Sequence, residues 1–139
     1  GVLTELIHCA PASITIMNRT RSRAEALRDD LSAEGMMYVR AMNESGGPCY
    51  DLVINATSTS LKNEGLQLDV ALFAANFVAY DMMYGPAKTP FVNWAIAAGA
   101  AAAMDGLGML VEQAAESFEL WRGKRPETKR VIDQIRNSL

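Results

Sequence analysis

The chain has 139 residues, half of them hydrophobic, which is enough for one domain with a buried core. Its 13 Lys and Arg residues against 16 Asp and Glu residues give a net charge of −3, which argues against broad electrostatic binding to nucleic acid or to an anionic membrane. The longest uncharged run, residues 89–104, contains a proline, an asparagine and a glycine and is too short to span a bilayer.

The first half of the chain alternates helix and strand signals. Apolar residues at helical spacing predict a helix over residues 2–7. Ser22, with Glu25 three residues later, fits a capping box that opens a helix running to about Leu31 and closed by Gly35. Short runs of β-branched and apolar residues predict strands at residues 13–17, 36–42 and 50–57.

The second half continues the alternation. Trp94 and Trp121 fall on apolar helix faces, so both are expected to pack against neighbouring elements. Strands that alternate with helices imply a doubly wound parallel sheet of the α/β class, with ligands bound at the carboxyl ends of its strands. The patterns predict strands at residues 76–84 and 101–106, a turn at 85–90, and helices at 91–99, at 107 through to the glycine at 123, and at 126–139.

A cluster of positive charge follows the strand expected at residues 13–17. At the end of the second strand of a Rossmann-type sheet, a carboxylate suits the ribose of NAD, whereas an arginine accommodates the 2′-phosphate of NADP. Here that position is Asn18, followed by Arg19, Thr20 and, one turn on, Arg23, which together suit a dianionic phosphate. The alternative is that these arginines and Arg21 are solvated and pair loosely with nearby carboxylates.

A second polar segment is residues 104–118. Gly106 and Gly108 allow close backbone approach at the junction between a strand and a helix, and Met109 and Gln113 lie one turn apart, off the apolar face. The amide of Gln113 could therefore face a cleft. The alternative is a glycine-rich turn into a packed helix with a solvent-facing Gln113.

Four blocks of the sequence together resemble one enzyme family. They are "NRTRSRAEAL", "DLVINATSTSL", "YDMMYGPAKTPF" and "DGLGMLVEQAAESFELWRG", and their order and approximate spacing are similar to those of the nucleotide-binding half of shikimate dehydrogenases. That family reduces 3-dehydroshikimate to shikimate with NADPH in the pathway to aromatic amino acids (chorismate biosynthesis). Its members usually have an N-terminal substrate domain and a Rossmann-like domain.

The resemblance implies roles for individual residues, carried over by position. One departure is Ser60, where many members of the family carry a glycine. The implied cofactor is NADP, with its 2′-phosphate at Asn18, Arg19, Thr20 and Arg23, its ribose and phosphate region at Thr57 and Ser58, and its nicotinamide at Met82, Gly106 and Met109. The implied substrate-binding residues are Tyr84 and Gln113.

The resemblance also implies that parts of the family pattern stand before Gly1. These are the Gly-rich loop, the first strand of the sheet, and the substrate domain with the Lys and Asp used for proton transfer. No catalytic residue is therefore expected in residues 1–139, which form a partial NADP-binding domain and are expected to be inactive alone. Because the first strand is central in a 3-2-1-4-5-6 sheet, the chain should form two half-sheets with unpaired edges and could complete them by self-association.

Other residues indicate the compartment and exclude some site types. Cys9 and Cys49 lie far apart without a CxxC spacing, as expected of reduced thiols in a cytosolic protein. Glu5 and His8 interrupt the first apolar segment where a signal peptide would need an unbroken one, so a cytoplasmic protein is expected. No metal site is expected, because His8 has no ligating partner near it in the pattern.

Two alternatives to an NADP-dependent shikimate dehydrogenase remain open from the sequence. One is a quinate/shikimate dehydrogenase with relaxed cofactor choice, which Asn18 and the arginines disfavour. The other is a non-catalytic nucleotide-binding module that keeps the phosphate-binding residues. In either enzyme the partner is a small-molecule substrate, with no nucleic acid and no membrane.

Overall fold

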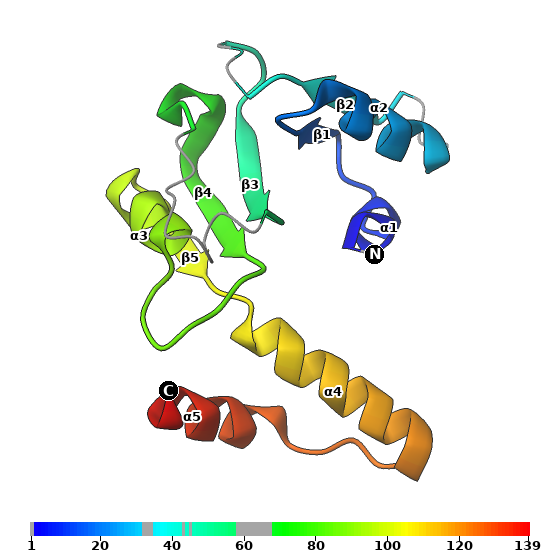
Figure 1. The fold of residues 1–139 in the computed structure, drawn as a ribbon, viewed down its shortest axis with the longest axis vertical. Helices are drawn as coiled ribbons and strands as arrows, with labels where there is room; N and C mark the ends of the chain where they lie inside the picture. The colour runs from blue at the N-terminus through cyan, green and yellow to red at the C-terminus, as the bar shows by residue number, and fades with distance from the viewer. Residues whose placement is uncertain (1, 32–34, 43, 45, 58–67) are drawn as a thin grey trace. The chain divides into compact units, whose positions relative to one another are not determined.

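The computed structural model describes residues 2–31, 35–42, 44, 46–57 and 68–139. These belong to two compact units, Gly1–Gly46 and Gly47–Leu139, each with its own parallel sheet. Figure 1 shows the helices and strands of both units. No helix in the described part of the chain combines the length and the apolar character needed to cross a membrane.

The first unit is a two-stranded parallel sheet with a crossover helix. Ala24, on the inner face of the crossover helix, is almost fully buried, which fits a βαβ unit in which the helix covers the strand pair. The two strands pair in parallel from Ile14 opposite Met37 to Met17 opposite Arg40. The elements of this unit are α1 (Val2–His8), β1 (Ile14–Met17), α2 (Arg21–Asp30) and β2 (Met37–Arg40).

Helix α2 begins earlier than predicted and ends close to Leu31, as predicted. Its N-cap is Thr20, and Ser22 already lies in the first turn, so the predicted capping box is wrong. The reason is local: the Asn18 side chain accepts a hydrogen bond from the Thr20 N–H at 3.0 Å, which turns the chain into the helix two residues sooner. The helix ends at Asp30, and Gly35, with φ +86°, lies in the turn before β2.

The second unit is built on a three-stranded parallel sheet in the order β3-β4-β5. Helix α3 packs against β4 and β5. Between them Phe73 and Phe77 stack with ring centroids 4.8 Å apart, and Trp94 meets Phe73 edge-on at 5.7 Å. The prediction that Trp94 packs is therefore confirmed. The bounds are β3 (Tyr50–Asn55), the short 3-10 helix η2 (Val70–Leu72), β4 (Phe73–Asp81), α3 (Pro90–Ala97) and β5 (Ala102–Met104).

Strand β4 is displaced toward the N-terminus relative to the prediction. It begins at Phe73 rather than at residue 76, and its register with β3 shifts in a stretch that contains Asn76 at φ +68°. The strand ends at Asp81: the Met82 N–H still donates to the Asn55 carbonyl at 3.0 Å, but the Met83 N–H turns inward and donates to the Asp81 carboxylate at 3.1 Å. Met82 and Tyr84 therefore lie just beyond the strand, where residues of a ligand site are expected.

The chain ends in two helices that lie side by side, α4 (Leu107–Arg122) and α5 (Thr128–Ser138) (Figure 1). The buried residues of α4 are Leu107, Val111 and Ala115, a spacing of four that places them on one face. Gly123 ends the helix at φ +68°, as predicted. Trp121, in contrast, is 80% exposed, so the prediction that it packs is wrong. It stands in the last turn of α4, beyond Ala115, the last buried residue of the helix.

The strand order agrees with the predicted half-sheets. Strands β1 and β2 form one sheet and β3, β4 and β5 form another, all in parallel. Among the described residues, no strand pairs with the second edge of β1 or with the second edge of β3.

Candidate functional site

In the first unit the predicted phosphate-binding residues lie together where β1 ends and α2 begins. Asn18, Arg19, Thr20 and Arg23 are all exposed. The first turn of α2 contains no acidic residue, and the Thr20 side chain makes no capping hydrogen bond to the helix. The positive end of the helix and the Thr20 hydroxyl therefore face solvent without an anionic neighbour from their own helix.

The arginines of this cluster differ in their partners. Arg21 Nε donates to Glu25 Oε1 at 2.9 Å, and this bond together with the charge of Glu25 raises the pKa of Arg21. Neither Arg19 nor Arg23 forms an ion pair with any residue that the structure describes. The solvated alternative thus accounts for Arg21, whereas Arg19 and Arg23 keep guanidinium groups that an anion can bind.

In the second unit a buried polar pair stands at the carboxyl ends of β3 and β4. Asn55 is 1% exposed and Asp81 is 0% exposed, and Asn55 Nδ2 donates to Asp81 Oδ1 at 3.1 Å. The Thr57 N–H and hydroxyl both donate to Asn55 Oδ1, at 3.1 and 2.7 Å. Thr57, a predicted cofactor residue, is thereby held at the end of β3, while Ser58 lies outside the described residues.

The same carboxylate reaches the start of α3. The Thr89 hydroxyl donates to Asp81 Oδ2 at 2.6 Å and accepts from the Val92 N–H at 3.2 Å, so it caps the helix and binds Asp81 at once. Sequence reasoning placed Asn55 at a polar strand end but gave neither Asn55 nor Thr89 a role. The signals were an asparagine ending an apolar strand and a threonine before Pro90, the usual N-cap and N1 pattern.

Met82 and Gly106 are brought into direct contact. A Cβ on Gly106 would lie 2.2 Å from the Met82 carbonyl oxygen and 2.7 Å from its carbon, so only glycine fits. The Gly106 N–H donates to the Met83 carbonyl at 3.0 Å. These contacts join the end of β4 to the start of α4 and confirm the close backbone approach expected at this glycine.

Met109 lies one turn into α4 and is half-buried. Its backbone forms a hydrogen bond with Tyr80. Burial raises the pKa of Tyr80, the bond from Met109 opposes that rise, and the charge of Asp105 adds to it. The backbone of Met109 is thus held against β4 at the same edge as Met82 and Gly106.

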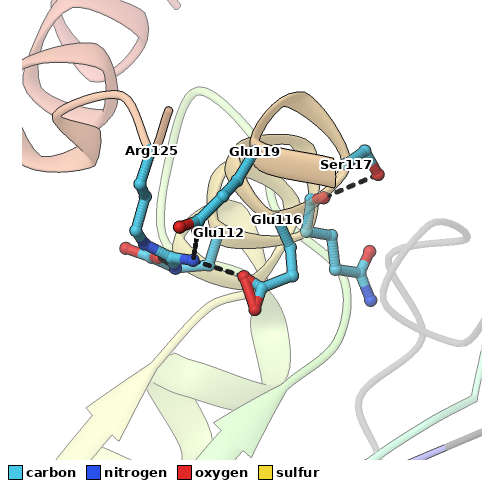
Figure 2. Close-up of polar contacts among 6 residues, drawn as sticks. Glu112, Glu116, Ser117, Glu119 and Arg125 are labelled. Carbon is cyan, nitrogen blue, oxygen red and sulfur yellow. Dashed lines mark hydrogen bonds and ion pairs between the residues drawn. The ribbon is translucent and has the colours of Figure 1, made fainter. Parts of the chain in front are cut away.

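The two predicted substrate-binding residues are exposed. Tyr84 is 41% exposed in the loop after β4, and Gln113 is an exposed residue of α4. The Ser117 hydroxyl donates to the Gln113 carbonyl at 3.0 Å, and Ser117 stands on the side of α4 away from Arg125 (Figure 2). Neither the Tyr84 hydroxyl nor the Gln113 amide forms a hydrogen bond with another described residue, so both groups can bind a ligand.

An ion pair joins the last helix to this edge of the sheet. Arg136 Nη2 bonds to Asp105 Oδ1 at 2.6 Å and Arg136 Nη1 donates to the Gly85 carbonyl at 3.3 Å. The Asp105 contact raises the pKa of Arg136. Beside it lies an open cavity of about 520 Å³ whose lining includes Tyr80, Lys88, Asp105 and Arg136.

A second charged network ties the segment between the two final helices to α4. Arg125 binds Glu112 at 2.8 Å, Glu119 at 3.1 Å and also Glu116 (Figure 2). Hydrogen bonds from Thr128 and then from Arg125 lower the pKa of Glu112. In the part of the chain that the structure describes, no group of three His, Cys, Asp or Glu side chains could hold a metal ion.

A family model and the curated relatives of this chain carry the name of one enzyme family. The family model described as "Shikimate 5'-dehydrogenase C-terminal domain" matches residues 106–136. The shikimate dehydrogenase (NADP(+)) of Vibrio cholerae is 48% identical over 139 residues, which are 100% of this chain and 50% of that protein. The chain spans about half the length of the curated relatives it matches.

Solved structures show the same fold. The crystal structure of an Ael1 enzyme from Pseudomonas putida has a TM-score of 0.84 and 40% identity over 95% of this chain and 48% of that chain. Shikimate 5-dehydrogenase from Thermus thermophilus, in complex with NADP(H) and shikimate, has a TM-score of 0.76 and 28% identity over 95% of this chain and 48% of that one.

Proposed function

Because this chain belongs to the shikimate dehydrogenase family, we propose that it is the NADP-binding part of an enzyme that reduces 3-dehydroshikimate to shikimate with NADPH. The observation that carries the cofactor proposal is that Arg19 and Arg23 form no ion pair among the described residues. Both follow a strand whose next residue is the neutral Asn18 and not a carboxylate.

The residues present fit NADP by the chemistry of their donors. Two guanidinium groups, the Thr20 hydroxyl and the start of α2 offer charge-assisted hydrogen bonds to a dianionic 2′-phosphate. A carboxylate in place of Asn18 would repel that phosphate, whereas the amide of Asn18 is neutral. The first unit therefore provides the binding energy and the selectivity for the adenosine end of the cofactor.

The second unit provides the surface for the reacting end. Thr57 and Ser58 are proposed to approach the ribose and phosphates, and Met82, Gly106 and Met109 to line the nicotinamide. The close contact between Met82 and Gly106 gives that surface a rigid backbone. When bound, NADPH supplies the hydride, and the chain's own contribution is to orient the ring and to exclude water from one of its faces.

Tyr84 and Gln113 are proposed to contact the substrate through their hydroxyl and amide groups. Both groups can donate and accept hydrogen bonds, which suits the hydroxyls and carboxylate of shikimate. The groups that move the proton during reduction are proposed to lie outside residues 1–139, by the family resemblance. The enzyme is proposed to act in the cytoplasm on this small-molecule substrate.

The test is carried out on the natural gene product that contains this sequence. Its intact mass is compared with the 15.1 kDa of the present chain, and its turnover of 3-dehydroshikimate is followed through the absorbance of NADPH. We expect turnover with NADPH and a KM for NADH larger by a factor on the order of 100, because two charge-assisted hydrogen bonds are lost with the 2′-phosphate.

Three outcomes would change the proposal. Equal use of NADH and NADPH would contradict the role of the arginines. Binding of NADPH without turnover of any dehydroshikimate would favour a nucleotide-binding module. Oxidation of quinate at the same rate as shikimate would favour the enzyme with the broader substrate range.

A further inference from the structure

The carboxylate of Asp81 is the most deeply buried charged group of the described residues, at 0% exposure. Burying a carboxylate is costly unless hydrogen bonds replace those lost to water. Here Asp81 Oδ1 accepts from Asn55 Nδ2 and from the Met83 N–H, both at 3.1 Å, and Oδ2 accepts from the Thr89 hydroxyl at 2.6 Å. A site this well supplied with donors fixes the position of whatever is bonded to it.

These donors, all from described residues, come from three different segments. Asn55 ends β3, Met83 follows β4, and Thr89 is the N-cap of α3. One carboxylate therefore holds together the carboxyl ends of two neighbouring strands and the start of the helix that covers them. Parallel strands place ligands at this edge, so the network lies directly beneath the proposed nicotinamide surface.

Met82 lies between the fixed points of this network. Its N–H donates to the Asn55 carbonyl at 3.0 Å, and the next amide, of Met83, donates to Asp81. The carbonyl of Met82 faces Gly106 at a distance that leaves no room for a Cβ, and the Gly106 N–H donates to the Met83 carbonyl at 3.0 Å. A shift of Asp81 would therefore move the peptide group between Met82 and Met83, and through it the backbone contact of Met82 with Gly106.

We propose that Asp81 is a positioning residue for hydride transfer: through the Met83 amide and the Thr89 hydroxyl it fixes the backbone of Met82 against Gly106. This inference rests on the proposed function, in which Met82 and Gly106 line the nicotinamide. Asp81 does not touch the cofactor in this proposal, because it is enclosed by protein. Its effect is on the alignment of the ring and not on the affinity for the adenosine end.

The experiment uses Asp81→Asn and Thr89→Val in the natural gene product. The amide nitrogen of an asparagine cannot accept a hydrogen bond, so at least one of the three donors loses its partner. Thr89→Val keeps the shape of the side chain and removes both the donor to Oδ2 and the acceptor that caps α3, whereas Asp81→Asn leaves that cap in place. We expect kcat to fall by about tenfold to a hundredfold, the scale of a small misplacement of reacting groups, with KM for NADPH unchanged.

Two control variants separate positioning from loss of stability. Leu72→Ala truncates a side chain that is 2% exposed in η2, directly before β4, so it should destabilise the same unit without changing kcat of the folded protein. Thr89→Ser keeps the hydroxyl and should restore kcat relative to Thr89→Val. If Leu72→Ala lowers kcat as much as Asp81→Asn does, the positioning role is overturned.

A second readout does not depend on activity. Amide hydrogen exchange at Met82, Met83 and Gly106 should accelerate at least tenfold in Asp81→Asn, a factor on the order expected when one local constraint is lost. In Leu72→Ala, exchange at the same three amides should remain slow at low denaturant. Equal protection in the two variants would overturn the proposal. A wild-type protein that is inactive with 3-dehydroshikimate would instead refute the proposed function, and the exchange rates would still decide whether Asp81 fixes this backbone.

Discussion

The backbone of Gly106 lies so close to Met82 that an added Cβ would stand 2.2 Å from the Met82 carbonyl oxygen. The obstacle is backbone on both sides, so no side chain can move away to relieve it. We expect Gly106→Ala to lower the free energy of unfolding by about 1–3 kcal/mol, the usual range for overpacking, and to lower turnover. Urea unfolding and steady-state kinetics of the natural gene product measure the two effects.

Gly108 is the matched control two residues further along the same chain. Nothing lies within 4 Å of a Cβ placed there, and the residue is inside α4. Gly108→Ala should therefore stabilise the protein by up to about 1 kcal/mol, because alanine has a higher helix propensity than glycine. Equal effects of the two substitutions would show that the contact between Gly106 and Met82 is looser than described.

The features that the sequence predicted well are those set by neighbours in the chain. Strands β1 and β3 and the end of α4 at Gly123 follow from local apolar runs and from glycine, and each lies within two residues of the expected place. Strand β5 is also within two residues of its expected place, but it follows from its position between two helices. The local pattern did not reveal which side chain near the end of a strand sets the start of the next helix. Asn18 starts α2 earlier than the Ser22 capping box would, through one hydrogen bond to Thr20.

Features that depend on packing partners were harder to predict. Trp121 has the spacing of a buried residue but stands in the last turn of α4, beyond the part of the helix that is buried. The partners of Asp81 lie 26 and 8 residues away, and nothing in a local pattern links Asn55 to Thr89. The residues of the nicotinamide surface came from the family resemblance, since a glycine after a short strand is weak evidence by itself.

The arginines at the end of β1 give the sharpest test of cofactor choice. Arg19→Ala and Arg23→Ala should each raise KM for NADPH about tenfold to a hundredfold, because each removes a charge-assisted hydrogen bond to the 2′-phosphate. KM for NADH should not change, since NADH lacks that phosphate. Steady-state kinetics with both cofactors measures the difference.

Arg21 provides the control for these substitutions. It is next in the chain and carries the same charge, but its guanidinium is bonded to Glu25. Arg21→Ala should therefore leave KM for NADPH close to its original value. A rise equal to that of Arg19→Ala would mean that the cluster acts only through its summed charge, and the effect would then disappear at high salt.

Arg136 should attach α5 to the rest of its unit. Its guanidinium bridges the Asp105 carboxylate and the Gly85 carbonyl, two acceptors that a lysine cannot bind together in the same geometry. Arg136→Ala should lower the free energy of unfolding by about 1 kcal/mol, a modest value because the side chain is 40% exposed. Arg136→Lys should recover only part of the loss.

Arg130 is the matched control on the same helix. It is exposed and forms no ion pair with the residues that the structure describes, so Arg130→Ala should not change the urea midpoint. Hydrogen exchange of the α5 amides should accelerate in Arg136→Ala alone. Acceleration in both variants would indicate that α5 is held by its overall charge and not by the bridge to Asp105.

The contact of α4 with α5 should weaken in acid because of Glu112. A hydrogen bond from Thr128, and after it the bond from Arg125, lowers the pKa of Glu112 below its ordinary value of 4.5. A carboxyl group whose pKa is lower in the folded state stabilises that state above its unfolded pKa, and the contribution is lost as the pH falls through the folded value. Stability from this contact should therefore be complete above about pH 4.5 and decline below it.

Glu112→Gln isolates this effect from the other carboxyl groups that titrate in the same range. The difference between wild-type and Glu112→Gln urea midpoints should be largest at neutral pH and should shrink as the pH falls below about 4.5. Glu127→Gln is the control, because Glu127 is exposed and does not bond to Arg125 in the described part of the chain. A difference for Glu112→Gln that stays constant with pH would mean that the side chain acts by packing, since a neutral contact does not respond to protonation.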